Sequence, residues 1–373
     1  MFLGWVFSFL KVMAIHLPIQ IPRFSFNLKA LGRKPAKQET ALACDLGKSN
    51  VVLLETERSG NDVILRRFLK AERPAEEAAL PDFLRQLHQS GNFSSNRVRI
   101  SVKGQGVIIR FVQFPLMKIE ELKSAIVYEA EKYIPFKYNE VALDFHVLSN
   151  KVPLANGGAG MDILMVAIRR DELGNLLSIF EKAGLEVELI DIDAVACFNA
   201  LGFFQPEALK THVAILDIGT ELSTLTVSRE GRPRFIRDIS YGSADLLKLL
   251  KRKLGLSDEE GKKQLQNDET PNPELFEMLQ QGLANLVGDL KVSMDYFQDQ
   301  SQSSDPVQTL YVGGGSGYHQ QILIETLTRD LGIPTQTLQV LNSLKLDPAV
   351  DAESLKKSQS LLPVALGLCL RNL

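Results

Sequence analysis

The sequence predicts an α/β protein built from two related domains that face each other across a cleft. Three glycine-containing turns support this prediction. Two are copies of a D-x-G hairpin, at Asp45–Ser49 and Asp217–Thr220, and the third is a glycine-rich turn at Gly313–Gly317. Each hairpin copy follows one apolar run and precedes another, which is typical of a strand, a tight turn and a second strand.

The two hairpins carry residue types that suit a phosphate group. Glycine lets backbone amides approach phosphate oxygens and tolerates a positive φ, and aspartate can hold a magnesium ion or its water molecules. The contacts predicted for a nucleotide, and for Mg2+ held indirectly by the two aspartates, are Asp45, Gly47, Lys48, Ser49, Asp217, Gly219 and Thr220. For either hairpin alone the alternative is an ordinary turn, because aspartate and glycine dominate turns.

The glycine-rich turn favours the nucleotide interpretation. A short β-rich run, Leu310–Val312, leads into it, and a helical stretch from His319 to about Leu331 follows. Such a turn directs the N-terminal amides of a helix at an anion, although it could also be a flexible loop. Because the hairpins and this turn occur together, we interpret them as a nucleotide cleft. The contacts predicted here are Gly313, Gly314, Gly315 and Ser316.

Composition and charge argue against a nucleic-acid-binding protein and against a disulfide or cysteine–metal framework. The chain has 373 residues, 45% hydrophobic and 23% charged, which suits a globular protein of two domains. Six basic residues and no acidic one precede Glu39. Removing these six from the 42 basic residues leaves 36 against 45 acidic ones, so the rest of the chain carries −9. An acidic body argues against nucleic acid as the main partner. The three widely spaced cysteines form no metal or disulfide pattern.

Residues 1–40 form a basic, apolar leader. Its apolar run is interrupted by Lys11 and is too short to span a bilayer, and it lacks the charged start of a signal peptide. We expect peripheral contact with a membrane through its aromatic and basic residues. The alternatives are an upstream start codon and a disordered tail.

The remaining chain alternates strands and helices. Strands at about 41–46, 50–57 and 62–70 are predicted to form one meander, and strands at 97–103 and 107–114 a second. The stretch 255–272 is predicted as a polar turn. Since each half opens with a D-x-G hairpin and closes with a helix, we expect domains at 41–205 and 206–373.

This arrangement resembles the actin-like ATPase superfamily, and one stretch is more specific. The run EAEKYIPF at Glu129–Phe136, followed by EVALDF at Glu140–Phe145, is similar to the hallmark segment of the PilM family, cytoplasmic actin-like proteins of type IV pilus assembly. The family's D-x-D-x-x-A and A-x-G-L-x-L-R patterns match Asp191–Ala196 and Ala365–Arg371. The resemblance covers about 41–373.

The resemblance implies an actin-like fold that binds ATP and Mg2+ and is at most a slow ATPase. Domain 1 would consist of subdomain 1A with an inserted α+β subdomain 1C at about 75–160, and domain 2 of 2A with 2B at about 250–305. Asp193 would orient the attacking water, or would act only as an acid at a helix N-terminus. The family's A-E-x-x-K adenosine segment is replaced by Gly261–Leu265, which implies weaker nucleotide binding than in relatives.

The resemblance also implies a protein partner. In the family, the tail of the inner-membrane protein PilN docks between 1A and 1C. The implied contacts, whose alternative is the core of the subdomain, are Ile126, Tyr133, Ile134, Pro135 and Phe136. The protein would then be a scaffold at the cytoplasmic face of the inner membrane that also meets pilus motor ATPases. The alternatives are an FtsA-like division protein, a nucleotide-free GspL-like secretion component and a small-molecule kinase.

Overall fold

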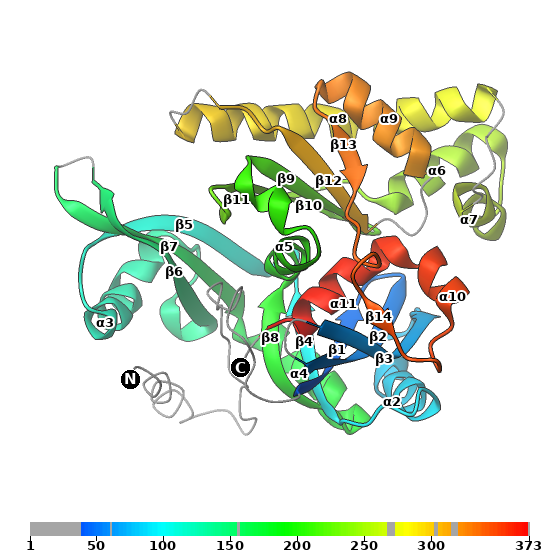
Figure 1. The fold of residues 1–373 in the computed structure, drawn as a ribbon, viewed down its shortest axis with the longest axis horizontal. Helices are drawn as coiled ribbons and strands as arrows, with labels where there is room; N and C mark the ends of the chain where they lie inside the picture. The colour runs from blue at the N-terminus through cyan, green and yellow to red at the C-terminus, as the bar shows by residue number, and fades with distance from the viewer. Residues whose placement is uncertain are drawn as a thin grey trace.

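A computed structural model describes residues 39–59, 62–154, 157–266, 273–301, 305–314 and 320–371 of the chain. The leader, apart from its last two residues, lies outside these ranges, as do Gly315 and Ser316 of the glycine-rich turn. The described residues form three sheets with helices packed between and around them (Figure 1).

The largest sheet opens with the first D-x-G hairpin. Strands β1 (Glu39–Leu46), β2 (Asn50–Ser59) and β3 (Asp62–Glu72) pair antiparallel, which confirms the first predicted meander. Strands β4 (Arg97–Val102) and β8 (Glu186–Ile192) continue the sheet in parallel beyond β1, and β14 (Lys345–Leu346) adds to its other edge. The strand order is β14-β3-β2-β1-β4-β8.

The second sheet repeats this plan around the second hairpin. Strands β9 (Val213–Ile218), β10 (Ser223–Arg229) and β11 (Arg232–Ile239) form another antiparallel meander. Strands β12 (Thr309–Gly314) and β13 (Thr335–Thr337) then extend it in parallel. The two sheets therefore carry the two hairpins at corresponding positions.

The third sheet is an insertion of strands β5 (Val107–Pro115), β7 (Ala159–Arg169) and β6 (Val141–Pro153), in that order, with α3 (Ile119–Glu129) on one face. The predicted second meander is wrong: β4 pairs in parallel with β1 and β8, whereas β5 pairs with β7. Gly104, at φ +96°, turns the chain out of the large sheet between the two strands. The inserted sheet thus spans 107–169, while α2 (Leu80–Ser90) and β4 of the predicted 75–160 subdomain lie with the large sheet.

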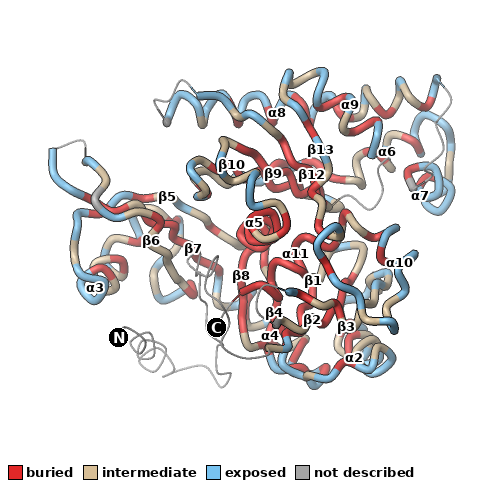
Figure 2. Tube along the Cα trace, viewed as in Figure 1, coloured by how far each residue is buried: buried red, intermediate tan, exposed pale blue. Residues whose placement is uncertain are grey.

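Two helices lie between the large sheet and the second sheet. They are α5 (Asp193–Phe204) and α11 (Leu362–Cys369), and they share one apolar core with both sheets (Figures 1 and 2). On β1, Ala41 and Ala43 face this core, and Leu42 and Cys44 face the core on the opposite side of the sheet. A strand buried on both faces explains the unbroken apolar run in the sequence.

The outer faces of these sheets are covered by the remaining helices. Helices α2 (Leu80–Ser90) and α4 (Arg170–Ala183) cover the large sheet. The second sheet is covered by α6 (Ser243–Leu254), α7 (Asp258–Gln266), α8 (Pro273–Ser301) and α9 (Gln320–Leu331). The stretch 255–272 was predicted as a polar turn. This prediction is wrong for the residues that form α7. In the described ranges, none of the helices has both the length and the hydrophobicity needed to cross a bilayer.

The C-terminal segment returns to the first half of the molecule. Strand β14 joins the large sheet, and α10 (Ala352–Lys357) and α11 follow it. Short 3-10 helices complete the chain at 77–79, 130–132, 138–140, 206–210 and 359–361. The predicted division at 205/206 had placed the whole segment in the second half.

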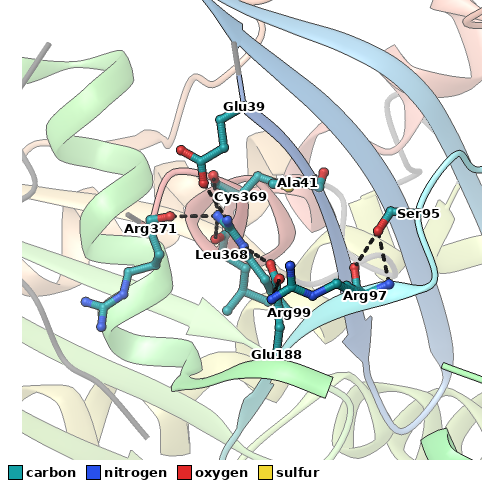
Figure 3. A network of polar contacts seen from close by, with 9 residues as sticks. All are labelled: Glu39, Ala41, Ser95, Arg97, Arg99, Glu188, Leu368, Cys369 and Arg371. Carbon is teal, nitrogen blue, oxygen red and sulfur yellow. Dashed lines mark hydrogen bonds and ion pairs between the residues drawn. The ribbon is translucent and has the colours of Figure 1, made fainter. Parts of the chain in front are cut away.

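A buried arginine holds the end of α11 to the large sheet (Figure 3). The Arg99 side chain is 1% exposed, and its Nη1 donates to the carbonyl oxygens of Cys369 at 3.0 Å and Arg371 at 2.6 Å. Its Nε and Nη2 donate to Glu188 at 2.8 Å and Glu39 at 2.7 Å. A cation at the C-terminus of a helix satisfies carbonyls that have no partner within the helix.

The first prediction concerns the contact between α5 and α11. A Cβ added at Gly367 would lie 1.8 Å from the carbonyl oxygen of Ala196, so the helices must separate to admit it. We expect Gly367→Ala to lower the free energy of unfolding by about 2–3 kcal/mol in urea denaturation. Gly288→Ala is the matched control, because a Cβ there meets only open space on α8. A Gly367→Ala protein as stable as this control would contradict the prediction.

A second prediction concerns Arg99. Replacement by methionine leaves two carbonyls without their cation, and it leaves Glu188, whose side chain is 8% exposed, without its buried partner and paired with the exposed Arg97. We expect Arg99→Met to destabilise the fold by about 3–5 kcal/mol. Arg97 also pairs with Glu188 but is 56% exposed, so Arg97→Met should cost at most about 1 kcal/mol. Similar losses for the two variants in urea denaturation would show that burial of Arg99 is not decisive.

Candidate functional site

The two hairpins meet at a cavity between the two large sheets. The cavity has a volume of about 570 Å³ and lies where β1, β9 and β12 end. Among the residues predicted to bind nucleotide, those that line it are Asp45, Gly47, Lys48, Ser49, Asp217, Gly219, Thr220 and Gly314. Gly313 lies beside the cavity and faces Pro363 of α11, and Gly315 and Ser316 are outside the described residues.

The tips of the hairpins touch across the cavity. The Ser49 Oγ and Thr220 Oγ1 atoms are 2.8 Å apart. Each turn is too tight for a side chain at its glycine, since a Cβ at Gly219 would lie 2.6 Å from the carbonyl oxygen of Leu222. Gly314 has φ +72°, and a Cβ there would lie 2.6 Å from the Asp217 carboxylate. Glycine at these positions leaves backbone exposed to a ligand in the cavity.

A lysine that the sequence analysis missed lies among the aspartates. Lys103 follows β4 directly, and its Nζ is 2.6 Å from Asp193 Oδ2 and 3.5 Å from Asp217 Oδ2. Asp193 begins α5 and is 3% exposed, whereas Lys103 is 28% exposed and lines the cavity. The sequence feature that could have identified Lys103 is the K-G-x-G run after an apolar strand. This run indicates a position at the cleft only when the pairing of β4 with β1 is known.

Three carboxylates share this single ammonium group. Burial and the neighbouring Asp193 raise the pKa of Asp45 to about 7, although Lys103 opposes the shift. Burial likewise raises the pKa of Asp217, and Lys103 again lowers it. Burial disfavours the charged form of Lys103, but attraction by Asp193, Asp217 and Asp45 holds its pKa well above its usual value. The excess of negative charge suits a divalent cation such as Mg2+.

The aspartates are not arranged as a complete metal centre. The described ranges contain no group of three His, Cys, Asp or Glu side chains placed to hold a metal ion directly. A magnesium ion would need further oxygen ligands, and water molecules and phosphates are the usual ones. The chemistry of Asp45 and Asp217 therefore fits an ion that arrives with a phosphate ligand.

The segment aligned with the adenosine motif lies elsewhere. Among the described residues that line the cavity, none comes from Gly261–Leu265. Leu265 is buried in the core of the second sheet, and Lys262 Nζ lies 3.5 Å from Glu72 Oε1. This ion pair crosses from α7 to the end of β3 in the first half of the molecule.

The five predicted partner contacts differ in accessibility. Ile126 and Ile134 are 1% and 4% exposed and pack in the core between α3 and the inserted sheet. Tyr133 and Phe136 are half-buried at its edge, and Pro135 is exposed. The Arg169 guanidinium lies 5.9 Å from the centre of the Phe136 ring. Tyr133, Pro135 and Phe136 are therefore the members of the set that a partner can reach.

The raised pKa of Asp45 leads to a prediction for stability without metal or nucleotide. The unfolded carboxyl titrates near 3.8 and the folded one near 7, so the folded state binds the proton more tightly. The contribution of this group to the free energy of unfolding is therefore fully present below about pH 4 and is lost as the pH rises to 7. Asp45→Asn removes the titrating group. We expect urea denaturation to show a smaller loss of stability between pH 5 and pH 8 in Asp45→Asn than in the wild type, and equal losses would contradict the assignment.

Comparison with known proteins agrees with this architecture. The family model described as type IV pilus assembly protein PilM matches residues 43–373. A solved PilM–PilN type IV pilus biogenesis complex contains a chain 27% identical to this one, with a TM-score of 0.75 over 89% of this chain and 98% of that one. The ethanolamine utilization protein EutJ from Carboxydothermus hydrogenoformans has a TM-score of 0.53 at 14% identity, over 91% and 92% of the two chains. The predicted actin-like ATPase fold is confirmed, and the chain belongs to the PilM family of type IV pilus assembly proteins.

Proposed function

We propose that this protein is a nucleotide-binding scaffold of the type IV pilus assembly platform, located in the cytoplasm at the inner face of the inner membrane. The proposal depends on one observation: the tips of the two D-x-G hairpins are in contact, and Lys103 and the three aspartates lie beside them. Phosphate-binding backbone, an excess of carboxylates and the ammonium group of Lys103 together suit a magnesium–nucleotide complex.

In this proposal the cleft residues have separate roles. Backbone N–H groups of the two hairpins and of the glycine-rich turn after β12 would hold the phosphates of ATP. Asp45 and Asp217 would hold the accompanying Mg2+ indirectly, through water molecules. Asp193 is held by Lys103 at 2.6 Å at the start of α5, where it can orient a water molecule near the phosphates. The cleft thus supports nucleotide binding and at most slow hydrolysis.

The partner in this proposal is the N-terminal tail of a PilN-like inner-membrane protein. The most similar structure reported above is a complex of a PilM with a PilN. We place the tail between the inserted sheet and the large sheet, with Tyr133, Pro135 and Phe136 at the rim. Contacts with pilus motor ATPases, and with the membrane through residues 1–40, belong to the same proposal.

Calorimetric titration of the full chain with a synthetic N-terminal peptide of the PilN-like protein, with and without Mg-ATP, tests this function. We expect saturable 1:1 binding that Phe136→Ala weakens at least about tenfold. Tyr128→Ala is the control, since Tyr128 lies on α3 in the same subdomain, is 81% exposed and is not in the predicted set. Asp217→Asn should weaken Mg-ATP binding about tenfold or more and leave peptide binding without nucleotide unchanged. A wild-type protein that binds neither peptide nor Mg-ATP would overturn the proposal.

A further inference from the structure

The inserted sheet contacts the second half of the molecule as well as the first. Strand β11 is an edge strand of the second sheet, and Arg234 Nη1 on this strand lies 2.5 Å from Asp162 Oδ2 on β7. The other oxygen of Asp162 accepts a hydrogen bond from Gln113 Nε2 at 2.9 Å. A second contact runs from Arg232 Nη1 to Ser149 Oγ on β6 at 2.9 Å. All three strands of the inserted sheet therefore take part.

The Arg234–Asp162 ion pair is more than a surface contact. The two side chains are 22% and 17% exposed, so solvent screens the pair less than an exposed one. Arg237, three residues further along β11, is exposed and makes no ion pair within the part of the chain that the structure describes. Strand β11 therefore carries Arg234, which pairs with Asp162, and Arg237, which serves as a matched control.

The attachment of the inserted sheet to the first half is of a different kind. Leu164, Val166 and Ile168 of β7 pack in one apolar core with α4 and the large sheet. Its contacts with the second half include the polar ones described above and Ile236 of β11, which is only partly buried. A relative movement of the halves must therefore be absorbed at the β11 contact, because the apolar core is much more costly to break.

Both sides of this contact lead to the cleft. Strand β11 pairs along its length with β10, which starts next to the Asp217–Thr220 hairpin, and Thr224 Oγ1 donates to Asp238 Oδ1 at 2.8 Å. On the other side, β5 begins directly after Gly106, which lines the cavity. We therefore expect a ligand that changes the spacing of the hairpins to change the position of β11 relative to the inserted sheet.

We propose that the Arg234–Asp162 pair is a latch through which the occupancy of the cleft sets the position of the inserted sheet, and with it the groove presented to the partner tail. This inference rests on the proposed function, because it requires that Mg-ATP enters the cleft and that the tail binds beside the inserted sheet. Its distinct claim is that a single ion pair transmits the effect.

Hydrogen exchange of the full chain with and without Mg-ATP tests the latch. In the wild type we expect Mg-ATP to change exchange at both hairpins and along β5 and β7, and to change the Kd of the PilN-like peptide by at least about fivefold. In Arg234→Met the hairpins should still respond, whereas the response of β5 and β7 should vanish and the Kd ratio should fall below about twofold. Arg237→Met should behave like the wild type.

Further variants separate the latch from a general loss of structure. Asp162→Asn should reproduce Arg234→Met, and the double variant should add nothing, as expected for two partners in one contact. Each variant is first checked by thermal unfolding and by peptide binding without nucleotide. No Mg-ATP response at the hairpins of the wild type would contradict nucleotide binding and thus the proposed function. A hairpin response with unchanged β5 and β7 in the wild type, or a full response in Arg234→Met, would overturn the latch alone.

Discussion

The packing of α5 against α11 is the contact on which the rest of the structure depends. Gly367 places α11 directly on the backbone of Ala196, so a side chain at this position would collide with α5. Both helices are buried in a core that also contains residues of the large sheet and of the second sheet. The thickness of this layer sets the distance between the sheets, and therefore the distance between the hairpins at their ends.

The same layer explains why the cleft is acidic. Asp193 starts α5 between the sheets and pairs with Lys103, which lines the cavity, while Asp45 and Asp217 lie near the ends of the central strands on either side. Carboxylates gathered in this way repel each other, and burial disfavours their charge further. Lys103 reduces this repulsion in the absence of a ligand, because its ammonium group contacts both Asp193 and Asp217. A cation that enters with a phosphate ligand would relieve the repulsion that remains.

The sequence was sufficient to predict features that depend on local patterns. Both hairpins and their flanking strands follow from apolar runs around a D-x-G turn, and α11 follows from an apolar run after Pro363. Pairing between distant strands has no such local signal. The stretch 97–114 was predicted as one meander because both of its strands are apolar and a turn with two glycines separates them. In the structure, β4 and β5 belong to different sheets.

Errors at the candidate site have the same origin. Lys103 escaped notice because its position depends on the pairing of β4 with β1. Ile134 belongs to the run that resembles a family hallmark, and Ile126 lies three residues before that run, but sequence spacing cannot tell a core residue from a contact residue. Helix α7 has a polar sequence, so no apolar stripe predicts it. Leu265 is buried, but a single apolar residue does not indicate a helix.

The balance of contacts across the cleft favours a hinge between the halves. The Ser49–Thr220 contact is one hydrogen bond, worth about 1 kcal/mol in net terms. The Lys262–Glu72 pair is 48% and 77% exposed and contributes about as little. By contrast, the layer of α5 and α11 is a continuous apolar core that no small rearrangement can open. The cleft can therefore open at its mouth while its base stays fixed, and a ligand that binds the closed form more tightly than the open form shifts the population toward the closed form.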